Sequence, residues 1–132
     1  MSDKQHTLKS EAAVKGVGLH TGEAVTLTLC PAPAGHGLKF QRTDLDGSPV
    51  IPADADLVVS TARGTTLGKG EVKVNTTEHV LAALYALGVD NCLIKLDGAE
   101  VPIMDGSAMK FVEAIEKAGF AEQDAPRNWY EL

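Results

Sequence analysis

The hydrophobic periodicity of the chain changes near residue 76, from the alternation typical of strands to the three-to-four-residue spacing typical of helices. Before this point, Val25, Leu27 and Leu29 alternate with two threonines and a cysteine, and "LKFQR" at 38–42 repeats the pattern. Weaker strand patterns are "QHTLKS", "AAVKG", "ADLVVS" and "EVKVN". The first half of the chain is therefore predicted to form a sheet.

The second half predicts two helices with a strand between them. The first helix starts near Thr76 or Thr77, either of which can serve as N-cap, and ends at Gly88. "NCLIKLDG" is short, apolar and rich in branched residues, which is typical of a central strand. The second helix runs from about Ser107 to Ala118 and ends at the following glycine in the same manner. This order predicts an α+β fold, a single domain whose two helices pack on one face of a mixed β-sheet.

Length and charge narrow the class of protein. The chain has 132 residues, which fits one domain, and its net charge of -6 excludes nucleic acid as the expected partner. The N-terminal "MSDKQHTLKS" has no apolar stretch, so we expect no secretory signal and no transmembrane segment. Cys30 and Cys92 stand in no CxxC spacing, which predicts reduced thiols in a cytoplasmic protein.

The pair Glu78 and His79 lies at the predicted start of the first helix. The unpaired N–H groups and the dipole at a helix N-terminus favour a negative charge, so a glutamate there is also an ordinary opening residue. A zinc hydrolase needs an imidazole on the metal and a nearby carboxylate that accepts a proton. The dipeptide alone leaves both interpretations open, and it is not the HExxH arrangement.

Three further segments carry candidate residues. His20 lies in "GVGLHTG", a glycine-rich stretch that also suits a tight loop between two strands. Asp105 lies in "VPIMDGSA", where it or Ser107 can cap the second helix. Arg63 lies in the polar stretch "STARGTTL", where it can face an anion or only solvent.

Taken together, these segments closely resemble one family. "GVGLHTG", "VTLTLCPAPAG", "FQRTDL", "IPADADLVVSTARGTTL", "TTEHVLAALYALGVDN" and "VPIMDGSAMKFVEAI" follow one another in the order and spacing of the zinc-dependent UDP-3-O-acyl-N-acetylglucosamine deacetylases of lipid A biosynthesis. The resemblance covers nearly the whole chain and corresponds to the N-terminal half of the family enzyme.

The resemblance implies two similar α+β domains, with an active site between them that removes acetate from a UDP-linked, acylated glucosamine. It implies that His79 is one of three Zn²⁺ ligands and that Glu78 is the general base that takes a proton from the attacking water. It also implies that five further residues line the active site: His20, Ala62, Arg63, Gly64 and Asp105. The role of Asp105 is the least defined of these.

The chain departs from the family pattern because it has no HKxxD motif, which supplies the other two zinc ligands from the C-terminal domain. We therefore predict that residues 1–126 form the N-terminal deacetylase domain and that 127–132 begin the connection to a second, absent domain. With one zinc ligand the chain alone is expected to be inactive, as a fragment or as one half of a split enzyme. The alternative is a standalone, non-catalytic module of the same fold that binds a partner or ligand.

Overall fold

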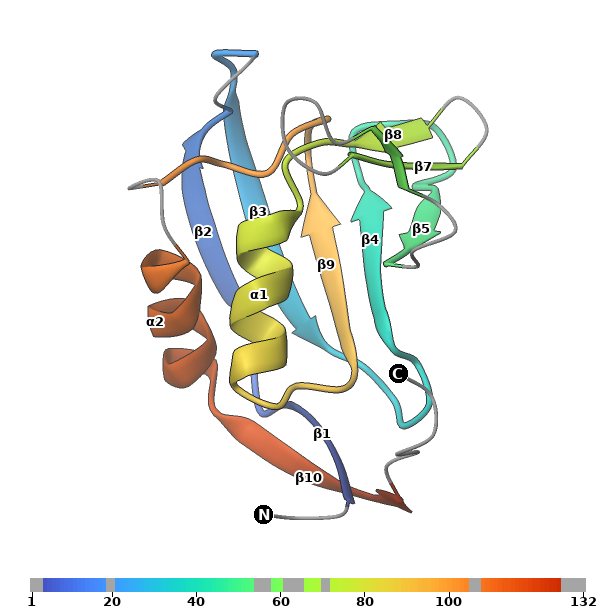
Figure 1. The fold of residues 1–132 in the computed structure, drawn as a ribbon, viewed down its shortest axis with the longest axis vertical. Coiled ribbons are helices and arrows are strands. Elements are labelled where there is room, and N and C mark those ends of the chain that lie inside the picture. The colour runs from blue at the N-terminus through green and yellow to red at the C-terminus, as the bar shows by residue number, and fades with distance from the viewer. Residues whose placement is uncertain are drawn as a thin grey trace.

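The computed structural model describes residues 4–18, 21–53, 58–60, 66–69, 72–104 and 108–126. Along these residues the elements follow one another as shown in Figure 1. Their bounds are β1 Lys4–Leu8, β2 Ala12–Val17, β3 Ala24–Pro31, β4 Leu38–Arg42, β5 Val50–Pro52, β6 Val58–Ser60, β7 Thr66–Lys69, β8 Val72–Val74, α1 Glu78–Ala86, β9 Cys92–Leu96, α2 Met109–Ala118 and β10 Phe120–Pro126.

The main sheet has the strand order β2-β3-β9-β4-β5. Its neighbours are antiparallel except β4 and β9, which are parallel, so the sheet is mixed. The segment 92–96 is its central strand, as the sequence predicts. The described residues also form a two-stranded sheet of β1 and β10 and a three-stranded sheet of β6, β7 and β8.

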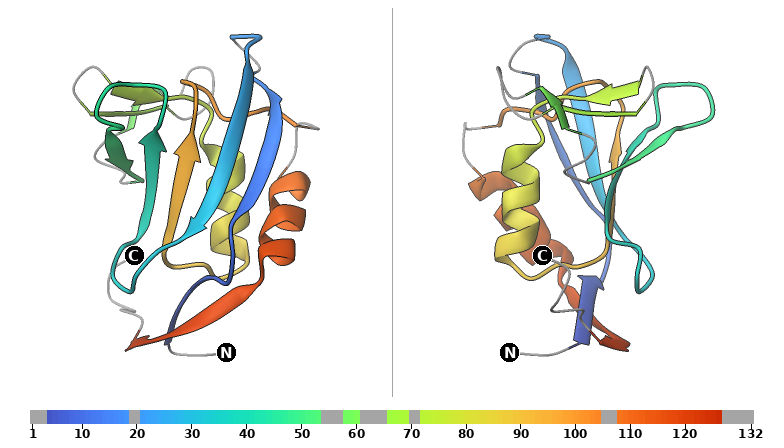
Figure 2. Two further views of the ribbon diagram at one scale, coloured as in Figure 1. Left: turned by 180° about the vertical axis from the view of Figure 1, so that it is seen from behind. Right: turned by 45° about the vertical axis from the view of Figure 1, so that its right-hand side comes forward.

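Both helices lie on one face of the main sheet, and the views of Figure 2 show the opposite face without a helix over it. The register aligns Leu29 of β3 with Ile94 of β9 and Ile94 with Phe40 of β4, and all three side chains are fully buried. The fully buried Phe111 and Leu84 come from α2 and α1 and belong to the same hydrophobic core. The predicted α+β fold, with its helix pair on one face of a mixed sheet, is confirmed.

The helix ends differ in part from the prediction. At the end of α1, the N–H of Gly88 donates to Tyr85 O and that of Val89 to Leu84 O, and Gly88 has φ 74°, which is the expected left-handed end. Gly119 at the end of α2 does not repeat it, because its φ of 80° and ψ of 170° belong to an extended region that is essentially restricted to glycine. This conformation sends the chain directly into β10. The helix itself begins at Met109, and the predicted start at Ser107 lies outside the described residues.

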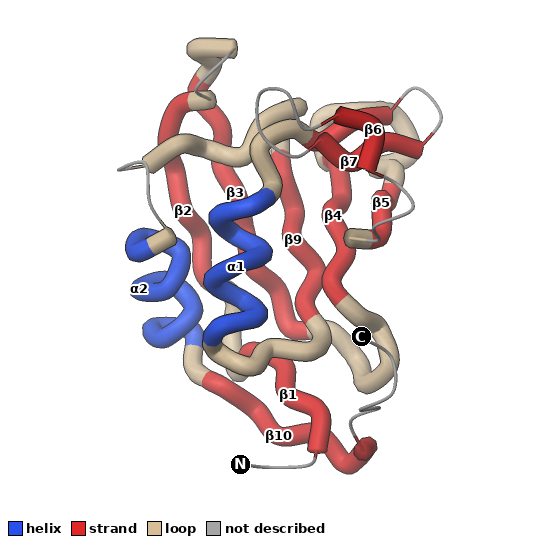
Figure 3. Tube along the Cα trace, viewed as in Figure 1, coloured by secondary structure: helices blue, strands red, loops and turns tan. Residues whose placement is uncertain are grey.

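Three strands were not predicted: β5, β7 and β10. The last, "FAEQDAP", has five residues that strands disfavour, and it forms because β1 pairs with it along its length (Figure 3). In the described part of the chain no helix is long and apolar enough to span a membrane.

Asn91, which is 2% exposed, joins the β1–β10 pair to the rest of the domain. Its Nδ2 donates to Gln5 Oε1 at 2.8 Å and to Gln123 Oε1 at 2.7 Å. Its Oδ1 accepts the N–H of Gly37 at 2.8 Å, and its backbone oxygen accepts the hydroxyl of Thr7 at 2.7 Å. One buried amide therefore connects strands from both ends of the described chain to the turn before β4.

Candidate functional site

Glu78 and His79 are the first two residues of α1, and both side chains are half-buried. A carboxylate in the first helical turn is stabilised by the helix dipole and by the N–H groups without helical partners. Thr77 occupies the N-cap position, but its side chain makes no cap hydrogen bond. The start of this helix is therefore oriented by something other than a side-chain cap.

Thr76, directly before the N-cap, has the unusual conformation in this region. Its φ of 62° is left-handed, which costs a β-branched residue about 1–3 kcal/mol. Its side chain is 5% exposed, and its hydroxyl donates to Glu100 Oε2 at 2.9 Å. The sequence offered Thr76 as an alternative N-cap, and the structure places its hydroxyl on a distant carboxylate instead.

The segment 99–103, which follows β9, crosses the sheet end between β2 and the start of α1 (Figure 1). On one side it lies along Asn75, whose N–H donates to Ala99 O at 2.7 Å and whose oxygen accepts the N–H of Val101 at 3.1 Å. On the other side, Gly18 bridges Pro102 in antiparallel fashion. This segment therefore brings the end of β2 and the residues before α1 together.

Glu100 is the second residue of that segment and is 2% exposed. Its Oε1 accepts the N–H of Thr21 at 3.0 Å, while its Oε2 accepts the hydroxyl of Thr76. A Cβ added to Gly18 would overlap Glu100 Oε1 and the Thr21 hydroxyl, so only glycine allows this approach. The turn is closed further by the N–H of Gly22, which donates to Gly18 O at 3.0 Å.

The three-stranded sheet of β6, β7 and β8 is hydrogen-bonded to Asn75 and to the end of β4. The hydroxyl of Thr66, the first residue of β7, donates to Asn75 Oδ1 at 2.9 Å. Arg42 at the end of β4 donates to Lys73 O of β8 at 2.9 Å and to both carboxylate oxygens of Asp44. The hydrogen bonds from the Arg42 guanidinium hold the pKa of Asp44 below its ordinary value. These contacts fix the strand that leads into α1.

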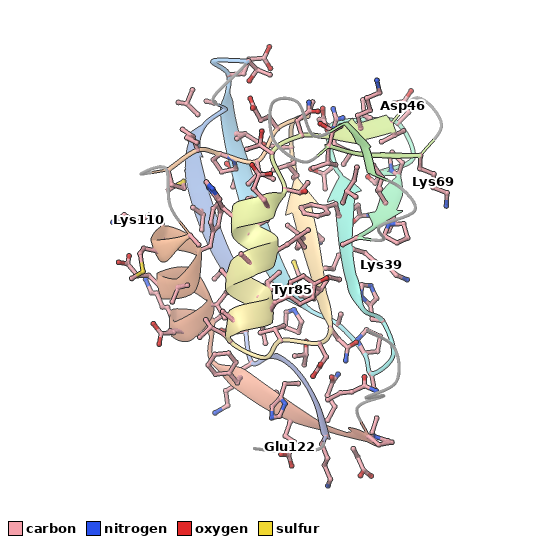
Figure 4. The ribbon with its side chains drawn as sticks, viewed as in Figure 1. Lys39, Asp46, Lys69, Tyr85, Lys110 and Glu122 are labelled. Atoms are coloured by element: carbon pink, nitrogen blue, oxygen red, sulfur yellow. The ribbon has the colours of Figure 1, made fainter. Side chains whose placement is uncertain are left out.

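Of the site residues named from the sequence, Glu78 and His79 are described and lie side by side. The remainder lie outside the described residues: His20, Ala62, Arg63, Gly64 and Asp105. The nearest described residues in the chain are Gly18 and Thr21 for His20, Thr66 for the group at 62–64, and Met104 for Asp105. Met104 lines a cavity of about 390 Å³ whose wall includes Val17, Ile103 and Lys110, the last labelled in Figure 4.

Glu100 and the left-handed Thr76 are the features that the sequence reading missed. The available signal was a glutamate in "GAEVPI", placed directly before an apolar pair where a solvated charge is not expected. The partners of Glu100 lie 79 and 24 residues away in the chain, so their meeting depends on the fold.

A metal site requires several donor side chains within reach of one ion. The described ranges bring no three His, Cys, Asp or Glu side chains together as a cation site. A catalytic zinc needs about three protein ligands. His79 is a suitable nitrogen donor, but the described residues do not by themselves fit a complete zinc centre.

Both cysteines are buried and free, as predicted. The register sets Cys30 opposite Leu93 and Cys92 opposite Pro31, so the two thiols point to opposite faces of the sheet. Burial raises the pKa of Cys92 to about 12, and burial together with the Glu11 carboxylate raises that of Cys30. Neither thiol has the lowered pKa of a nucleophile.

Comparison with known proteins identifies relatives along nearly the full chain. A sequence model of the family described as UDP-3-O-acyl N-acetylglycosamine deacetylase matches residues 5–132. The chain is 57% identical over 127 residues to the bifunctional enzyme LpxC/FabZ of Porphyromonas gingivalis, covering 96% of this chain and 28% of that protein. It is 55% identical over 126 residues to the UDP-3-O-acyl-N-acetylglucosamine deacetylase of Myxococcus xanthus, covering 96% of this chain and 40% of that protein.

A third relative, the UDP-3-O-acyl-N-acetylglucosamine deacetylase of Hahella chejuensis, is 55% identical over 129 residues, covering 98% of this chain and 43% of that protein. The chain therefore spans less than half the length of the curated relatives it matches.

Proposed function

The chain belongs to the UDP-3-O-acyl N-acetylglycosamine deacetylase family, and from this premise we propose that it is the N-terminal domain of a deacetylase of lipid A biosynthesis. The proposed reaction hydrolyses the amide of a UDP-linked, acylated N-acetylglucosamine and releases acetate. The observation that carries the proposal is the adjacent Glu78 and His79 at the start of α1, close to the place where Gly18, Thr21 and Thr76 meet the segment 99–103.

In this proposal His79 is one protein ligand of a catalytic zinc, and Glu78 is the general base. When bound, the metal supplies Lewis-acid polarisation of the scissile carbonyl. The Glu78 carboxylate takes the proton of the attacking water and returns a proton to the leaving amine nitrogen. His20, Ala62, Arg63, Gly64 and Asp105 are proposed to line the site, and what supports this is that the described residues next to them border the converging segments.

The remaining ligands are proposed to come from a C-terminal deacetylase domain that follows the N-terminal unit of residues 1–126, with 127–132 as the connection. The proposed compartment is the cytoplasm, where both buried thiols remain reduced.

The test uses the longer protein that contains this chain together with its C-terminal domain. Glu78→Gln, which keeps the shape of the side chain but removes the base, should lower kcat by about 100-fold or more. Glu116→Gln, on the exposed side of α2, is the matched control and should keep full activity. His79→Gln should lower the zinc content of purified protein, measured by elemental analysis.

Two results would contradict the proposal. Normal deacetylation by Glu78→Gln would remove its role as base. Turnover by residues 1–132 alone with added zinc would show that no second domain is required.

A further inference from the structure

We infer that Glu100 is a positioning residue for this reaction, because its buried carboxylate holds Thr76, just before the start of α1, and Thr21 in one fixed arrangement. The inference rests on the proposed function, since it concerns the direction in which the start of α1 presents Glu78 and His79. Glu100 is not offered as a group that touches substrate.

The two oxygens of one carboxylate contact two different segments. Oε1 accepts the backbone N–H of Thr21 at 3.0 Å, and Oε2 accepts the hydroxyl of Thr76 at 2.9 Å. The carboxylate is rigid and planar, so it sets the separation between its two partners. Because Glu100 is 2% exposed, water does not compete for these hydrogen bonds.

The backbone of Glu100 is itself held on both sides. Glu100 and Asn75 form a parallel bridge, and Gly18 and Pro102 form an antiparallel bridge two residues further along. The missing side chain of Gly18 provides the space in which the carboxylate reaches the loop. The side chain therefore projects from a fixed stretch of backbone and contacts Thr21 and Thr76 directly.

The contact with Thr76 acts on the geometry of the proposed base. Thr76 stands two residues before Glu78 in a strained left-handed conformation, and the N-cap residue that follows makes no side-chain cap hydrogen bond. The hydrogen bond from Thr76 to Glu100 keeps the strained residue in place. If it is lost, the backbone can relax, and the direction in which α1 presents Glu78 and His79 changes. A displacement of about 1 Å at reacting groups can cost about 100-fold in rate.

The chemistry of Glu100 suggests an informative pair of variants. Aspartate is one methylene shorter, so its carboxylate does not reach far enough from the backbone to accept from both partners. Glutamine has the same length, and its amide oxygen can accept the Thr21 N–H while its amide nitrogen donates to the Thr76 hydroxyl, which can rotate to accept. We therefore expect Glu100→Asp to lose the positioning of Thr21 and Thr76 and Glu100→Gln to retain it.

The experiment measures steady-state deacetylation by the longer protein that contains this chain. Glu100→Asp should lower kcat by about 10- to 100-fold and leave KM within about threefold, whereas Glu100→Gln should stay within about threefold in both. Asn91→Leu is the matched control, because Asn91 is equally buried at the other end of α1. It should weaken folding but leave kcat within about twofold. Amide hydrogen exchange at Thr21 should be faster in Glu100→Asp and unchanged in Asn91→Leu.

Each result has a defined meaning. Normal kcat in Glu100→Asp overturns the inference, as does an equal loss of kcat in Asn91→Leu, which would trace the loss to stability alone. If Glu100→Asp fails to fold, Thr76→Val replaces it, since it removes the same hydrogen bond from the other partner and should lower kcat in the same way. Full activity in Glu78→Gln would instead reject the proposed function, a result that the Glu100 variants cannot produce.

Discussion

The two ends of α1 are each fixed by a polar side chain that is 2% exposed, Glu100 before the helix and Asn91 after it. Asn91 connects β1 and β10 to the turn before β4, and the nearby Gly88 takes its left-handed conformation without strain because it has no side chain. Glu100 instead holds the strained Thr76 beside the proposed base. The two equally buried side chains therefore differ in what they hold. Asn91 joins separate segments of the fold, whereas Glu100 holds Thr76 in a backbone conformation that is unfavourable by itself.

The largest effect on stability is expected at the Asn91 end. Asn91→Leu keeps the branched shape of the side chain but removes three hydrogen bonds and leaves the Gly37 N–H without its acceptor. The free energy of unfolding should fall by about 3 kcal/mol, measured by urea denaturation. Asp124→Asn, at a fully exposed side chain of β10, is the control and should change it by less than about 0.5 kcal/mol. A loss below about 1 kcal/mol in Asn91→Leu would show that this end does not depend on the buried amide.

At the Glu100 end, two substitutions of Thr76 separate strain from hydrogen bonding. Thr76→Val keeps the β-branch but removes the donor to Glu100, so we expect a loss of about 1–3 kcal/mol. Thr76→Gly removes the same donor but also relieves the left-handed strain, so its stability should stay within about 1 kcal/mol of the parent. Thermal and urea unfolding of both variants check this order. Equal stability of the two variants would mean that the strain at Thr76 is negligible.

The smallest effect is expected at Asp44, whose partner Arg42 supports the strand before α1. The hydrogen bonds from Arg42 depress the pKa of Asp44 below its ordinary 3.8. The ionised Asp44 therefore adds to the free energy of unfolding above pH 3.8, and this stabilisation is lost as the pH falls through the lower folded-state pKa. Asp44→Asn should cost less than about 1 kcal/mol at pH 7, because this pair is partly solvated. The difference from the parent should shrink in urea unfolding at pH 3, and a difference that grows there would contradict the assignment.

The sequence was sufficient where local pattern decides structure. The alternation at 25–29, the branched apolar run at 92–96 and the helical spacing after residue 77 predicted the main sheet, its central strand and the helix pair. The strands β5, β7 and β10 were missed because they are short or polar and exist through their partners. Gly119 was misread because a glycine in the sequence does not indicate which positive-φ region it occupies.

The candidate site divides in the same way. Glu78 and His79 are adjacent in sequence, so their placement at a helix start was predictable from the pattern that follows them. The function of Glu100 depends on residues 24 and 79 positions away, and no spacing rule connects these. Thr76 shows the limit of local reasoning, since a good capping residue by type uses its hydroxyl for a contact made only in the folded chain.

The pairing of β1 with β10 has a mechanical consequence. Lys4 and Pro126 are register partners, so the first and last described strands meet at the outer end of one short ladder. A pull on the chain at these two positions would load the ladder one hydrogen-bonded pair at a time, which is the weak, unzipping direction. Tension from whatever follows residue 126 would therefore separate β1 from β10 first. The β1–β10 ladder would open under a lower force than the main sheet, so the main sheet and the start of α1 would keep their structure at that force.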